Sequence, residues 1–525
     1  MLVPGEDAMS DLIATTLPQS PGAVTACVGA GTLLLVFLLS RKRSPRASGG
    51  VPNATEGSFL LGHALAYKKD PAAFLLRQSR TVGSIFRINL AGRRMTVLSG
   101  CGGGKGENLS AEVNLLKNAV NTPERILSAR DAVSSIGFEH TLGVANVYEG
   151  TNFHKRVIKD HLSLGDKLVP LLVSSFQTAF EAEVGCVADA CEHVIIADFL
   201  GLVRRCTLRA VIQVFLGKAF LEPSQNQDMD GIKFLDDFMT LQDAIEDATA
   251  AAAVLPRWLA LPLILRPVQK QRIKLQRRIA QRIERAWCAA LDDQGPWLRE
   301  FQRKGLNLTK ASEFTVGLLF AAHKNAAIGS AQSFLHLRLH GSKAHQSNAR
   351  FEAKSLLESP TFSALKQCSH IRMCCMETLR LTSHALGGIR TARQNCILGK
   401  NPVLGHKGGQ IELFPGEVIA ISHIVPSLNK ELWGQDADAY NPARKEWTDA
   451  KFHPNEYKFT AFSQGLHMCP GQRVALFLMQ SCVATLLASY EIEFVGRIPA
   501  LSFERATLAQ RDGNVQVKIR IKCKS

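Results

Sequence analysis

The chain has 525 residues, of which 46% are hydrophobic and 21% charged, and this balance excludes a disordered or a fibrous protein. Its formal net charge of +16 indicates an acidic partner, which is a nucleic acid, an anionic membrane surface or an acidic protein. The 13 cysteines form no CxxC pair and no Cys/His spacing of the zinc type. The sequence therefore predicts neither a disulfide framework nor a structural zinc site, and it favours a reducing compartment.

An uncharged run from Gly22 to Leu39, 18 residues long, is just long enough to cross a bilayer as a helix. Acidic residues precede this run and basic residues follow it, so the rest of the chain is expected on the cytosolic side. A cleaved signal peptide is the alternative, but its basic residues would precede the apolar run. The predicted organisation is a tail over residues 1–21, a single transmembrane signal-anchor over 22–40, a basic linker over 41–58 and one folded domain over 59–525.

The first elements after the linker are a helix and a hairpin. Asp70 followed by Pro71 has the N-cap and first-turn chemistry that begins a helix. Residues Ser84 to Leu98 alternate in hydrophobicity on both sides of Ala91 and Gly92, which predicts a β-hairpin. The next stretch, SGCGGGKGE, lacks the Ser or Thr that a phosphate-binding loop places after its lysine, so a flexible loop is the preferred interpretation.

From about residue 110 to 382 helical patterns dominate, and one of them is strongly basic. Val268 to Trp287 places Leu275, Ile279 and Ile283 on one face and arginines, including Arg282, on the others. The first interpretation is a solvated charged face beside a core stripe, and the second is contact with an anionic membrane surface. Nucleic-acid binding ranks third because no aromatic interleaving accompanies the charge, so no nucleic-acid partner is expected.

The last part of the chain changes character. Short strands broken by glycine and proline are predicted between Arg393 and Ile421, then a helix from Gln472 to about Ser489 and a strand from Val515 to Lys522. The expected fold class is mainly α (α+β), with a helix-rich core and a small β-rich lobe.

One short stretch, FSQGLHMCPGQRVA, carries chemistry. Phe462, Gly465, His467, Cys469 and Gly471 form the pattern F-x-x-G-x-H-x-C-x-G immediately before the last helix. The glycines permit a tight loop that a flat ligand can approach, and a helix N-terminus favours the thiolate of Cys469. His467 is a cation or donor suited to an acidic group on the same ligand. These features match a haem bound through a cysteine thiolate.

The stretch resembles the cysteine-ligand loop of the cytochrome P-450 family. The resemblance implies that haem b is bound by this loop, with Cys469 as the ligand of its iron and His467 beside a propionate. Arg390 resembles the second propionate partner of the family, and an exposed strand arginine is the alternative. Arg156, in NFHKRVIKDH, is a further candidate for holding the cofactor.

A second family feature lies in ETLRL, where Glu377 and Arg380 are three residues apart on one helix face. YNPARKEW resembles the loop that supplies another arginine, here Arg444, to the same carboxylate. In the family this cluster holds the cysteine loop against the helical core.

Within the family the chain is most similar to the sterol 14α-demethylases, in its N-terminal segment, in ETLRL and in the strand LFPGEVIAIS. It departs from them in the loop over the substrate, GVANVY, where Asn146 replaces an aromatic residue and Val147 replaces an aspartate. The substrate-pocket candidates that this resemblance gives are Tyr148, Asn146, Leu319, Ala322 and Leu386.

The central helix departs from the family as well. Most members have Ala-Gly-x-(Asp/His)-(Thr/Ser), whereas this chain has AAHKN over residues 321–325. An alcohol beside an acid or an imidazole passes protons, but the amide of Asn325 does not readily do so. Asn325, as a group that holds water or the oxygen ligand, and His323, as a relay, are the catalytic candidates. Lys324 is expected to point toward the helix surface, because burying its charge beside the haem is costly.

The resemblance implies an oxidoreductase, a haem-thiolate monooxygenase in the endoplasmic reticulum membrane, with one span and a catalytic domain facing the cytosol. NADPH–cytochrome P-450 reductase would supply the electrons, and an apolar lipid, a sterol above all, would be the substrate. Asparagine at position 325 also resembles the cholesterol 7α-hydroxylase and prostacyclin synthase branches, so a haem-thiolate isomerase or dehydratase of a lipid peroxide is an alternative. A membrane-tethered basic binding protein without haem is another.

Overall fold

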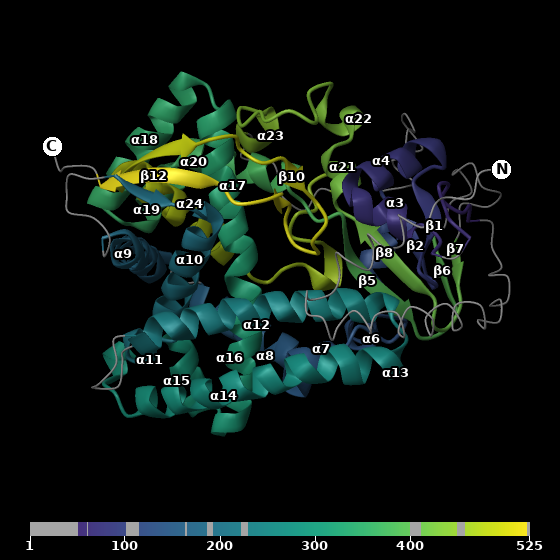
Figure 1. The fold of residues 1–525 in the computed structure, drawn as a ribbon, viewed down its shortest axis with the longest axis horizontal. Coiled ribbons are helices and arrows are strands. Elements are labelled where there is room, and N and C mark those ends of the chain that lie inside the picture. Colours follow the sequence, from purple (N-terminus) through teal and green to yellow (C-terminus); the bar gives the residue numbers. More distant parts are fainter. Residues whose placement is uncertain are drawn as a thin grey trace, which may run out of the picture.

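The computed structural model describes residues 51–59, 61–100, 115–162, 165–185, 193–221, 229–399, 411–448 and 457–521. The predicted signal-anchor over 22–40 and most of the glycine-rich loop after Gly100 lie outside the described residues. The mainly helical class with a small β-rich lobe is confirmed. Figure 1 shows the lobe on one side of the molecule and the helical body on the other.

The β-rich lobe is built on a five-stranded sheet in the order β1-β2-β8-β5-β3. Only β2 and β8 run parallel; the other neighbours are antiparallel. The predicted hairpin is confirmed, because Leu90 pairs with Arg93 across a two-residue turn. Ala91 and Gly92 both have positive φ, 48° and 92°, as tight hairpin turns of this length require. The five strands are β1 (Ile85–Leu90), β2 (Arg93–Leu98), β3 (Leu127–Ser128), β5 (Leu386–Ala392) and β8 (Val418–Ser422).

Three smaller sheets complete the strands. The predicted C-terminal strand is confirmed as β12, which pairs with β9 on one side and β4 on the other. The remaining strands form two short antiparallel pairs, β6 with β7 and β10 with β11. Their bounds are β4 (Val194–Ile196), β6 (Cys396–Leu398), β7 (Ile411–Leu413), β9 (Tyr490–Val495), β10 (Leu501–Ser502), β11 (Gln510–Arg511) and β12 (Gln516–Ile521).

The helical body is organised around α17, which crosses the molecule and packs on α10, α20 and α24 (Figure 1). The helices are α3 (Ala64–Lys69), α4 (Pro71–Thr81), α6 (Ala129–Ser135), α7 (Phe138–Thr141), α8 (Thr151–Leu162), α9 (Gly165–Val184), α10 (Phe199–Phe215), α11 (Lys218–Leu221), α12 (Met229–Val254), α13 (Arg257–Ala260), α14 (Arg266–Trp287), α15 (Pro296–Arg303), α16 (Leu308–Ala322), α17 (Lys324–His340), α18 (Lys343–Glu358), α19 (Phe362–Gln367), α20 (Ser369–Leu381), α21 (Ile424–Ser427), α22 (Lys430–Trp433), α23 (Lys445–Thr448) and α24 (Gln472–Ser489), with short turns η1 (Asn146–Gly150), η2 (Leu261–Leu265), η3 (Leu291–Asp293) and η4 (Gly465–His467).

Helix signals in the sequence are borne out at several ends. The Asp70 side chain accepts a hydrogen bond from the Ala73 backbone N–H at 2.9 Å and so caps α4, which begins at Pro71. The helix α24 spans Gln472–Ser489 as predicted, and it has the length and hydropathy of a membrane span by composition. In that window, however, 61% of the helix is buried against other parts of the chain, as in a core helix.

The basic helix α14 buries its predicted stripe, Leu275, Ile279 and Ile283, but not all of its charges are solvated. Arg282 is 2% exposed, donates to the Phe220 carbonyl at 3.0 Å and lies over the ring of Phe234. Its placement on a solvated face was therefore wrong. The long apolar stem and planar head of arginine allow it to pack this way in a helical core.

Candidate functional site

The cysteine loop closes on itself immediately before α24. The Cys469 backbone N–H donates to the Phe462 carbonyl at 2.8 Å, and the Met468 N–H donates to the Gly465 carbonyl at 3.1 Å. Gly465 has φ +66°, and a Cβ at this position would lie 2.5 Å from the Val120 carbonyl oxygen, so only glycine fits. The loop thus holds one half-buried free thiol at the start of a core helix.

The Cys469 thiol sits in surroundings that favour its neutral form, contrary to the expectation that the helix N-terminus favours the thiolate. Burial raises the pKa of Cys469, and a backbone hydrogen bond from Gly471 only partly opposes this effect. A metal ion at the sulfur reverses the balance, because a coordinating thiol is deprotonated outright. The loop therefore suits a metal-bound thiolate better than a free reactive cysteine.

The central helix is interrupted between α16 and α17. Helix α16 ends at Ala322 and α17 begins at Lys324, with His323 between them. Ala321 and Asn325 are exposed and Ala322 is half-buried, whereas nearly every side chain from Ala326 to Leu337 is buried. One turn further on, α17 packs closely on α24, since a Cβ at Gly329 would lie 2.8 Å from the Met479 methyl group. The uncovered patch of small side chains therefore lies on α16 and the start of α17, and the loop that holds Cys469 leads into α24, on which α17 packs.

Arg390 in β5 is a buried cation with an open hydrogen-bonding position. It is 4% exposed, so the alternative of an exposed strand arginine is wrong. Its Nη1 donates to the Ile389 carbonyl at 2.8 Å, whereas Nη2 is buried and has no hydrogen-bond partner among the described residues. Burial lowers the pKa of Arg390, and the Glu124 carboxylate opposes this effect. A buried guanidinium in this state is suited to an anion supplied by a ligand.

His467 of the cysteine loop contacts the Glu124 carboxylate, which also acts on Arg390. Its Nε2 lies 3.2 Å from Glu124 Oε2, while Glu124 also accepts from the Ser128 hydroxyl at 2.6 Å and caps α6. Burial and then the charge of Arg390 lower the pKa of His467. The two residues predicted to hold the acidic groups of the cofactor therefore lie in one electrostatic neighbourhood, with Glu124 between them.

Arg156 is placed less favourably than its neighbour. Arg156 is exposed on α8, whereas Lys155 donates to the Leu466 carbonyl in the cysteine loop at 3.2 Å. Lys155 was missed because nothing in the spacing of the sequence separates it from Arg156; only the rotation of α8 against the loop does so.

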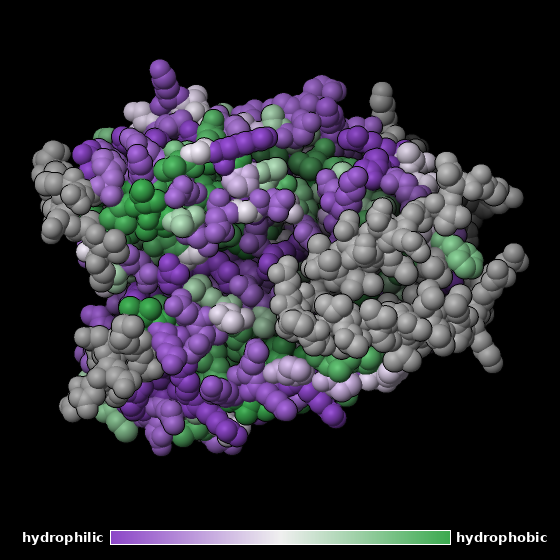
Figure 2. Space-filling view, viewed as in Figure 1, coloured by the Kyte–Doolittle hydropathy of each residue, from purple (hydrophilic) through white to green (hydrophobic). Residues whose placement is uncertain are grey.

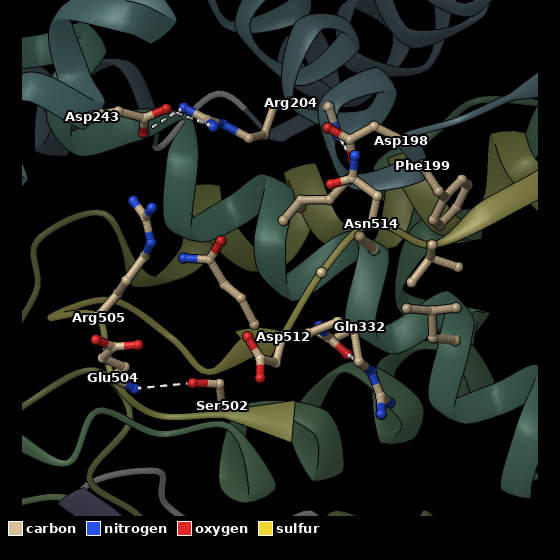
Figure 3. Close-up of a pocket in the computed structure, with 18 residues that line it drawn as sticks. Asp198, Phe199, Arg204, Asp243, Gln332, Ser502, Glu504, Arg505, Asp512 and Asn514 are labelled. Atoms are coloured by element: carbon tan, nitrogen blue, oxygen red, sulfur yellow. Dashed lines mark hydrogen bonds and ion pairs between the residues drawn. The ribbon is translucent and has the colours of Figure 1, made fainter. Parts of the chain in front are cut away.

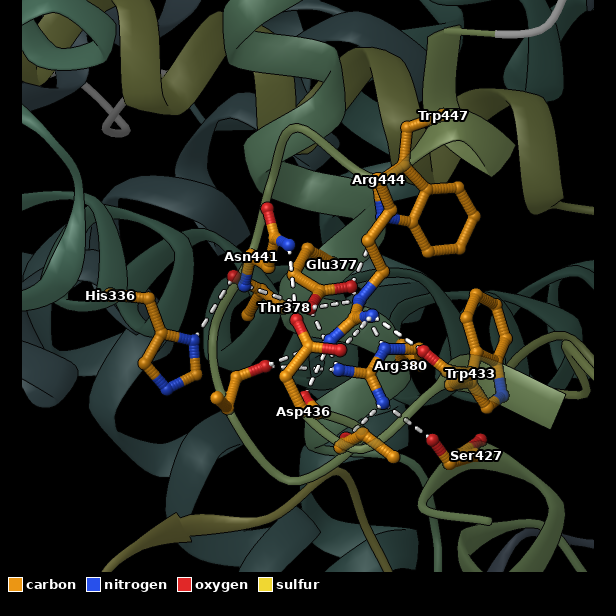
Figure 4. A network of polar contacts seen from close by, with 12 residues as sticks. His336, Glu377, Thr378, Arg380, Ser427, Trp433, Asp436, Asn441, Arg444 and Trp447 are labelled. Carbon is orange, nitrogen blue, oxygen red and sulfur yellow. Dashed lines mark hydrogen bonds and ion pairs between the residues drawn. The ribbon is translucent and has the colours of Figure 1, made fainter. Parts of the chain in front are cut away.

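Glu377 is the centre of a fully buried ion cluster (Figure 4). Arg380 meets it in a two-point contact, Nε to Oε2 at 2.8 Å and Nη2 to Oε1 at 2.7 Å. Arg444 arrives from the loop before α23, with Nε 3.0 Å from Oε1. The structure thus brings together the three residues predicted to form the cluster.

Further groups of the cluster were missed. The indole N–H of Trp447 donates to Glu377 Oε2 and the Asn441 backbone N–H donates to Oε1, both at 3.0 Å. The two guanidinium groups also donate to backbone carbonyls of the segment 427–439, and Arg444 Nη1 donates to the Asp436 carboxylate at 3.0 Å. Both missed residues lie within YNPARKEW, but sequence alone gave no sign that they face the carboxylate.

The three polar residues at the helix break point in different directions. His323 is fully buried, its Nδ1 bonds to the Leu319 carbonyl at 2.8 Å, and burial lowers its pKa to about 3. Lys324 is 1% exposed, so the expectation that it points to the helix surface was wrong. Its ammonium is neutralised by carboxylates of α12, which removes the cost on which that expectation rested. Asn325 accepts from the Leu508 N–H at 3.2 Å.

The predicted substrate loop is fastened to α16. Asn146 Nδ2 donates to the Leu142 and Glu313 carbonyls, and a Cβ at Gly317 would lie 2.2 Å from its Oδ1. Tyr148 is 41% exposed and its hydroxyl donates to Glu139. The other substrate candidates differ in exposure: Leu319 is fully buried, whereas Ala322 and Leu386 are half-buried.

Comparison with known proteins extends over most of the chain. A family model described as Cytochrome P450 matches residues 196–519. The lanosterol 14-alpha demethylase of Mus musculus is 23% identical over 501 residues, which cover 91% of this chain and 90% of that protein. The Homo sapiens protein of the same name is 24% identical, covering 84% and 81%. Cytochrome P450 monooxygenase pyvB of Aspergillus violaceofuscus is 23% identical, covering 96% and 97%.

Replacing Glu377 by Gln should destabilise the fold by roughly 3–5 kcal/mol, because the buried Arg380 loses its counter-charge and Arg444 keeps only the half-exposed Asp436. The free energy of unfolding in urea, followed by circular dichroism, measures this. Glu300→Gln is the matched control, since Glu300 and Arg303 have the same spacing on α15 but the Arg303 side chain is 63% exposed. That change should cost about 0.5 kcal/mol, and equal losses for the two variants would contradict the analysis.

Replacing Arg390 by Met should lower the amount of haem that the purified protein retains, because the buried position for an anion disappears. The haem-free protein should be unchanged or more stable by about 1–4 kcal/mol, since an incompletely partnered buried charge is removed. Pyridine haemochrome absorbance gives the first quantity and urea unfolding the second. Arg393→Met, on the same chain segment but exposed and paired with Asp131, is the control and should leave haem retention unchanged.

Proposed function

The chain belongs to the cytochrome P450 family, and on that premise we propose that it is a membrane-anchored monooxygenase of an apolar lipid, with a sterol as the leading candidate. Membership of the family makes the protein a haem enzyme that receives electrons from a reductase. The non-enzymatic basic binding protein considered above is therefore not retained. Substrate, membrane attachment and the particular reductase are proposals.

The residues present fit haem. Cys469 would ligate the iron, while Arg390 and His467 would hold the propionates. The observation that supports this assignment is the buried Nη2 of Arg390, which finds no hydrogen-bond acceptor among the described residues and is free to donate to an anionic group of a ligand. When bound, haem activates dioxygen, and the thiolate ligand donates the electron density that favours O–O cleavage.

Asn325 would act at the uncovered patch as a hydrogen-bond donor. Its carbonyl oxygen is occupied by the Leu508 N–H, so its NH₂ group is the part that remains to donate to a water or an oxygen atom there. His323 is held behind the helix, in contact with the Phe238 ring of α12, and its imidazole is neutral. Asn325 therefore orients a ligand, while neither residue supplies protons from solvent by itself.

A sterol is favoured by the length of similarity to proteins named lanosterol 14-alpha demethylase. The uncovered patch of Ala321 and Ala322 is small and apolar, which suits a bulky apolar substrate lying against α16 and α17. The substrate loop favours a substrate, or a position of attack, that differs from that of the lanosterol 14-alpha demethylases. Here the Asn146 amide bonds to the backbone of α16 and the Tyr148 hydroxyl bonds to Glu139.

Attachment to a membrane is supported by the surface near α13 as well as by the N-terminal apolar run. Trp258 and Leu263 are 58% and 62% exposed, and they lie just before the basic helix α14. Exposed aromatic and aliphatic side chains beside arginines and lysines suit an anionic lipid surface. Together with the predicted anchor, this surface supports the proposal of attachment to the cytosolic face of the endoplasmic reticulum membrane, where NADPH–cytochrome P450 reductase would supply electrons.

One observation favours a second reaction, the isomerisation or dehydration of a lipid peroxide. Asn325 stands where the family usually has an alcohol, and a peroxide substrate brings its own activated oxygen and needs no electrons from a reductase. Turnover of a fatty-acid hydroperoxide without NADPH, and none of a sterol with NADPH and reductase, would replace the monooxygenase proposal.

Cys469→Ala should abolish the red-shifted Soret band of the reduced, carbon-monoxide-treated protein, because the thiolate ligand is lost. Cys374→Ala is the matched control: Cys374 is fully buried and accepts from the Tyr440 hydroxyl at 3.0 Å, away from the cysteine loop. The Cys374→Ala variant should keep the red-shifted Soret band. Loss of the band in the control, with the fold intact, would refute Cys469 as the sole determinant.

Sterols should shift the haem spectrum from low to high spin when titrated into the purified protein, because an apolar ligand displaces water from the site. Lanosterol, cholesterol and a fatty-acid hydroperoxide serve as probes. A shift with the hydroperoxide and none with any sterol would refute the sterol proposal and leave the haem-thiolate assignment in place.

A further inference from the structure

One face of α17 carries three residues that all contact the same segment near the C-terminus. Asn325, Gly329 and Gln332 lie at i, i+4 and i+7, so they form a stripe about 10 Å long on one side of the helix. The segment that contacts them, 507–511, leads into β11 and includes it. One helix face is therefore matched to one short stretch of chain.

Three contacts hold this stripe to the segment. At the first position, the Asn325 side-chain oxygen accepts from the Leu508 N–H at 3.2 Å. At the last, the Gln332 side-chain oxygen accepts from Arg511 Nε, also at 3.2 Å. Between them, a Cβ added at Gly329 would lie 3.6 Å from the Leu508 side chain, which is ordinary packing distance. Two hydrogen bonds thus flank one apolar contact.

The end of the stripe at Gln332 borders a hollow of about 340 Å³ between α10, α17 and the β10–β11 hairpin. Figure 3 looks into this hollow, with Gln332 on one side and Arg505 and Glu504 on the other. Hydrophilic residues gather in the recess at the centre of the molecule in Figure 2. Water in such a hollow competes for polar side chains. The hairpin is therefore held to α17 here by the Arg511 contact and not by close packing on every side.

Arg511 is suited to fastening the hairpin. Its acceptors in the described part of the chain are neutral, the Gln332 amide oxygen and the Pro499 carbonyl, both at 3.2 Å. Burial lowers the pKa of Arg511, but an arginine stays charged in proteins, so both hydrogen bonds are charge-assisted. Gln332 is 1% exposed, and without Arg511 its oxygen would be buried and lose this partner.

The position of Leu508 decides which way the Asn325 amide is turned. The Ala509 N–H donates to the Thr382 carbonyl at 2.9 Å and the Thr507 hydroxyl donates to the Leu508 carbonyl at 3.0 Å, so the backbone around Leu508 is fixed. A backbone N–H can only donate, so the Asn325 oxygen must face it. The NH₂ group of Asn325 is thereby left for the uncovered patch, where the residue is exposed.

We propose that Arg511 and Gln332 are positioning residues for Asn325. Their contact keeps the segment 507–511 on α17, the Leu508 N–H then holds the Asn325 oxygen, and the Asn325 NH₂ group is turned to the ligand at the uncovered patch. The proposal rests on the monooxygenase function proposed above. A fixed donor favours a ligand oxygen that accepts a hydrogen bond, whereas an amide turned by 180° would present its own oxygen and repel the same atom.

Arg511→Met removes the donors of Arg511 and keeps a long apolar stem. In the reduced, carbon-monoxide-treated protein, the C–O stretching frequency should shift upward, because the hydrogen bond from Asn325 to the ligand is lost. Gln332→Leu should cause the same shift, whereas Gln332→Glu still accepts from Arg511 and should keep the wild-type frequency. Arg505→Met is the control: Arg505 is exposed in the same hairpin, and its replacement should leave the frequency unaltered.

Hydrogen exchange and turnover test the same series of contacts. Deuterium uptake by the peptide containing Leu508, measured by mass spectrometry, should be about 10-fold faster in Arg511→Met. With reductase, NADPH and the sterol that gives the largest spectral shift, product formation should fall about 10-fold or more at an unchanged spectral dissociation constant. In the Asn325→Ala background, Arg511→Met should change neither the frequency nor the product further, because no amide is left to orient.

General destabilisation lowers the amount of folded protein but leaves the C–O frequency of the folded molecules unchanged, so the frequency separates positioning from a structural role. A wild-type frequency in Arg511→Met would overturn the proposal, and so would effects of Arg511→Met and Asn325→Ala that simply add. The frequency is measured without substrate, so failure of the sterol proposal does not affect it. Absence of the red-shifted Soret band in the wild-type protein would instead refute the haem-thiolate function itself.

Discussion

A charge buried in a protein has to be neutralised where it lies, and this constraint organises the molecule around the cysteine loop. Glu377 is fully buried, and its charge and hydrogen-bond acceptors are satisfied within the chain by Arg380, Arg444 and the Trp447 indole. The cluster ties α20 to the segment 427–447, and Trp447 of that segment packs on Phe459, whose ring meets Phe462 of the cysteine loop. Arg390 is buried as well, but its Nη2 has no hydrogen-bond partner in the part of the chain that the structure describes. The contrast separates a site completed by the protein from one that a ligand completes.

The same constraint explains the unusual centre of the long helix. A lysine beside haem is costly when it stands alone, but two carboxylates of α12 make Lys324 tolerable in a nearly dry position. The interruption at His323 gives neighbouring residues opposite environments, with Lys324 toward α12 and Asn325 toward the uncovered patch. Two adjacent side chains on opposite sides of one helix therefore have different environments: Asn325 can bind a ligand, whereas Lys324 pairs with the carboxylates of α12.

The chain keeps the family's scaffold while its reactive surroundings have changed. Relatives 23–24% identical cover most of its length, and the cysteine loop and the Glu377 cluster follow the family pattern. Asn146, in the predicted substrate loop, bonds through its amide to the backbone of α16, so this loop is held by polar contacts. Scaffold residues are constrained by burial and pairing on every side, whereas residues over the substrate are constrained mainly by the substrate.

The sequence by itself determined the features that depend on neighbours in the chain. Positive φ at Ala91 and Gly92, the Asp70 cap, the tight turn at Gly465 and the spacing of Glu377 and Arg380 are local, so composition and periodicity predict them. Tertiary structure alone decided the burial of Arg390 and the partners of Lys324, which lie 81 and 78 residues away. Asn146 likewise meets a carbonyl 167 residues distant. Sequence periodicity shows which face of an element is apolar, but only the packed structure shows which charged side chain of another element pairs with a buried one.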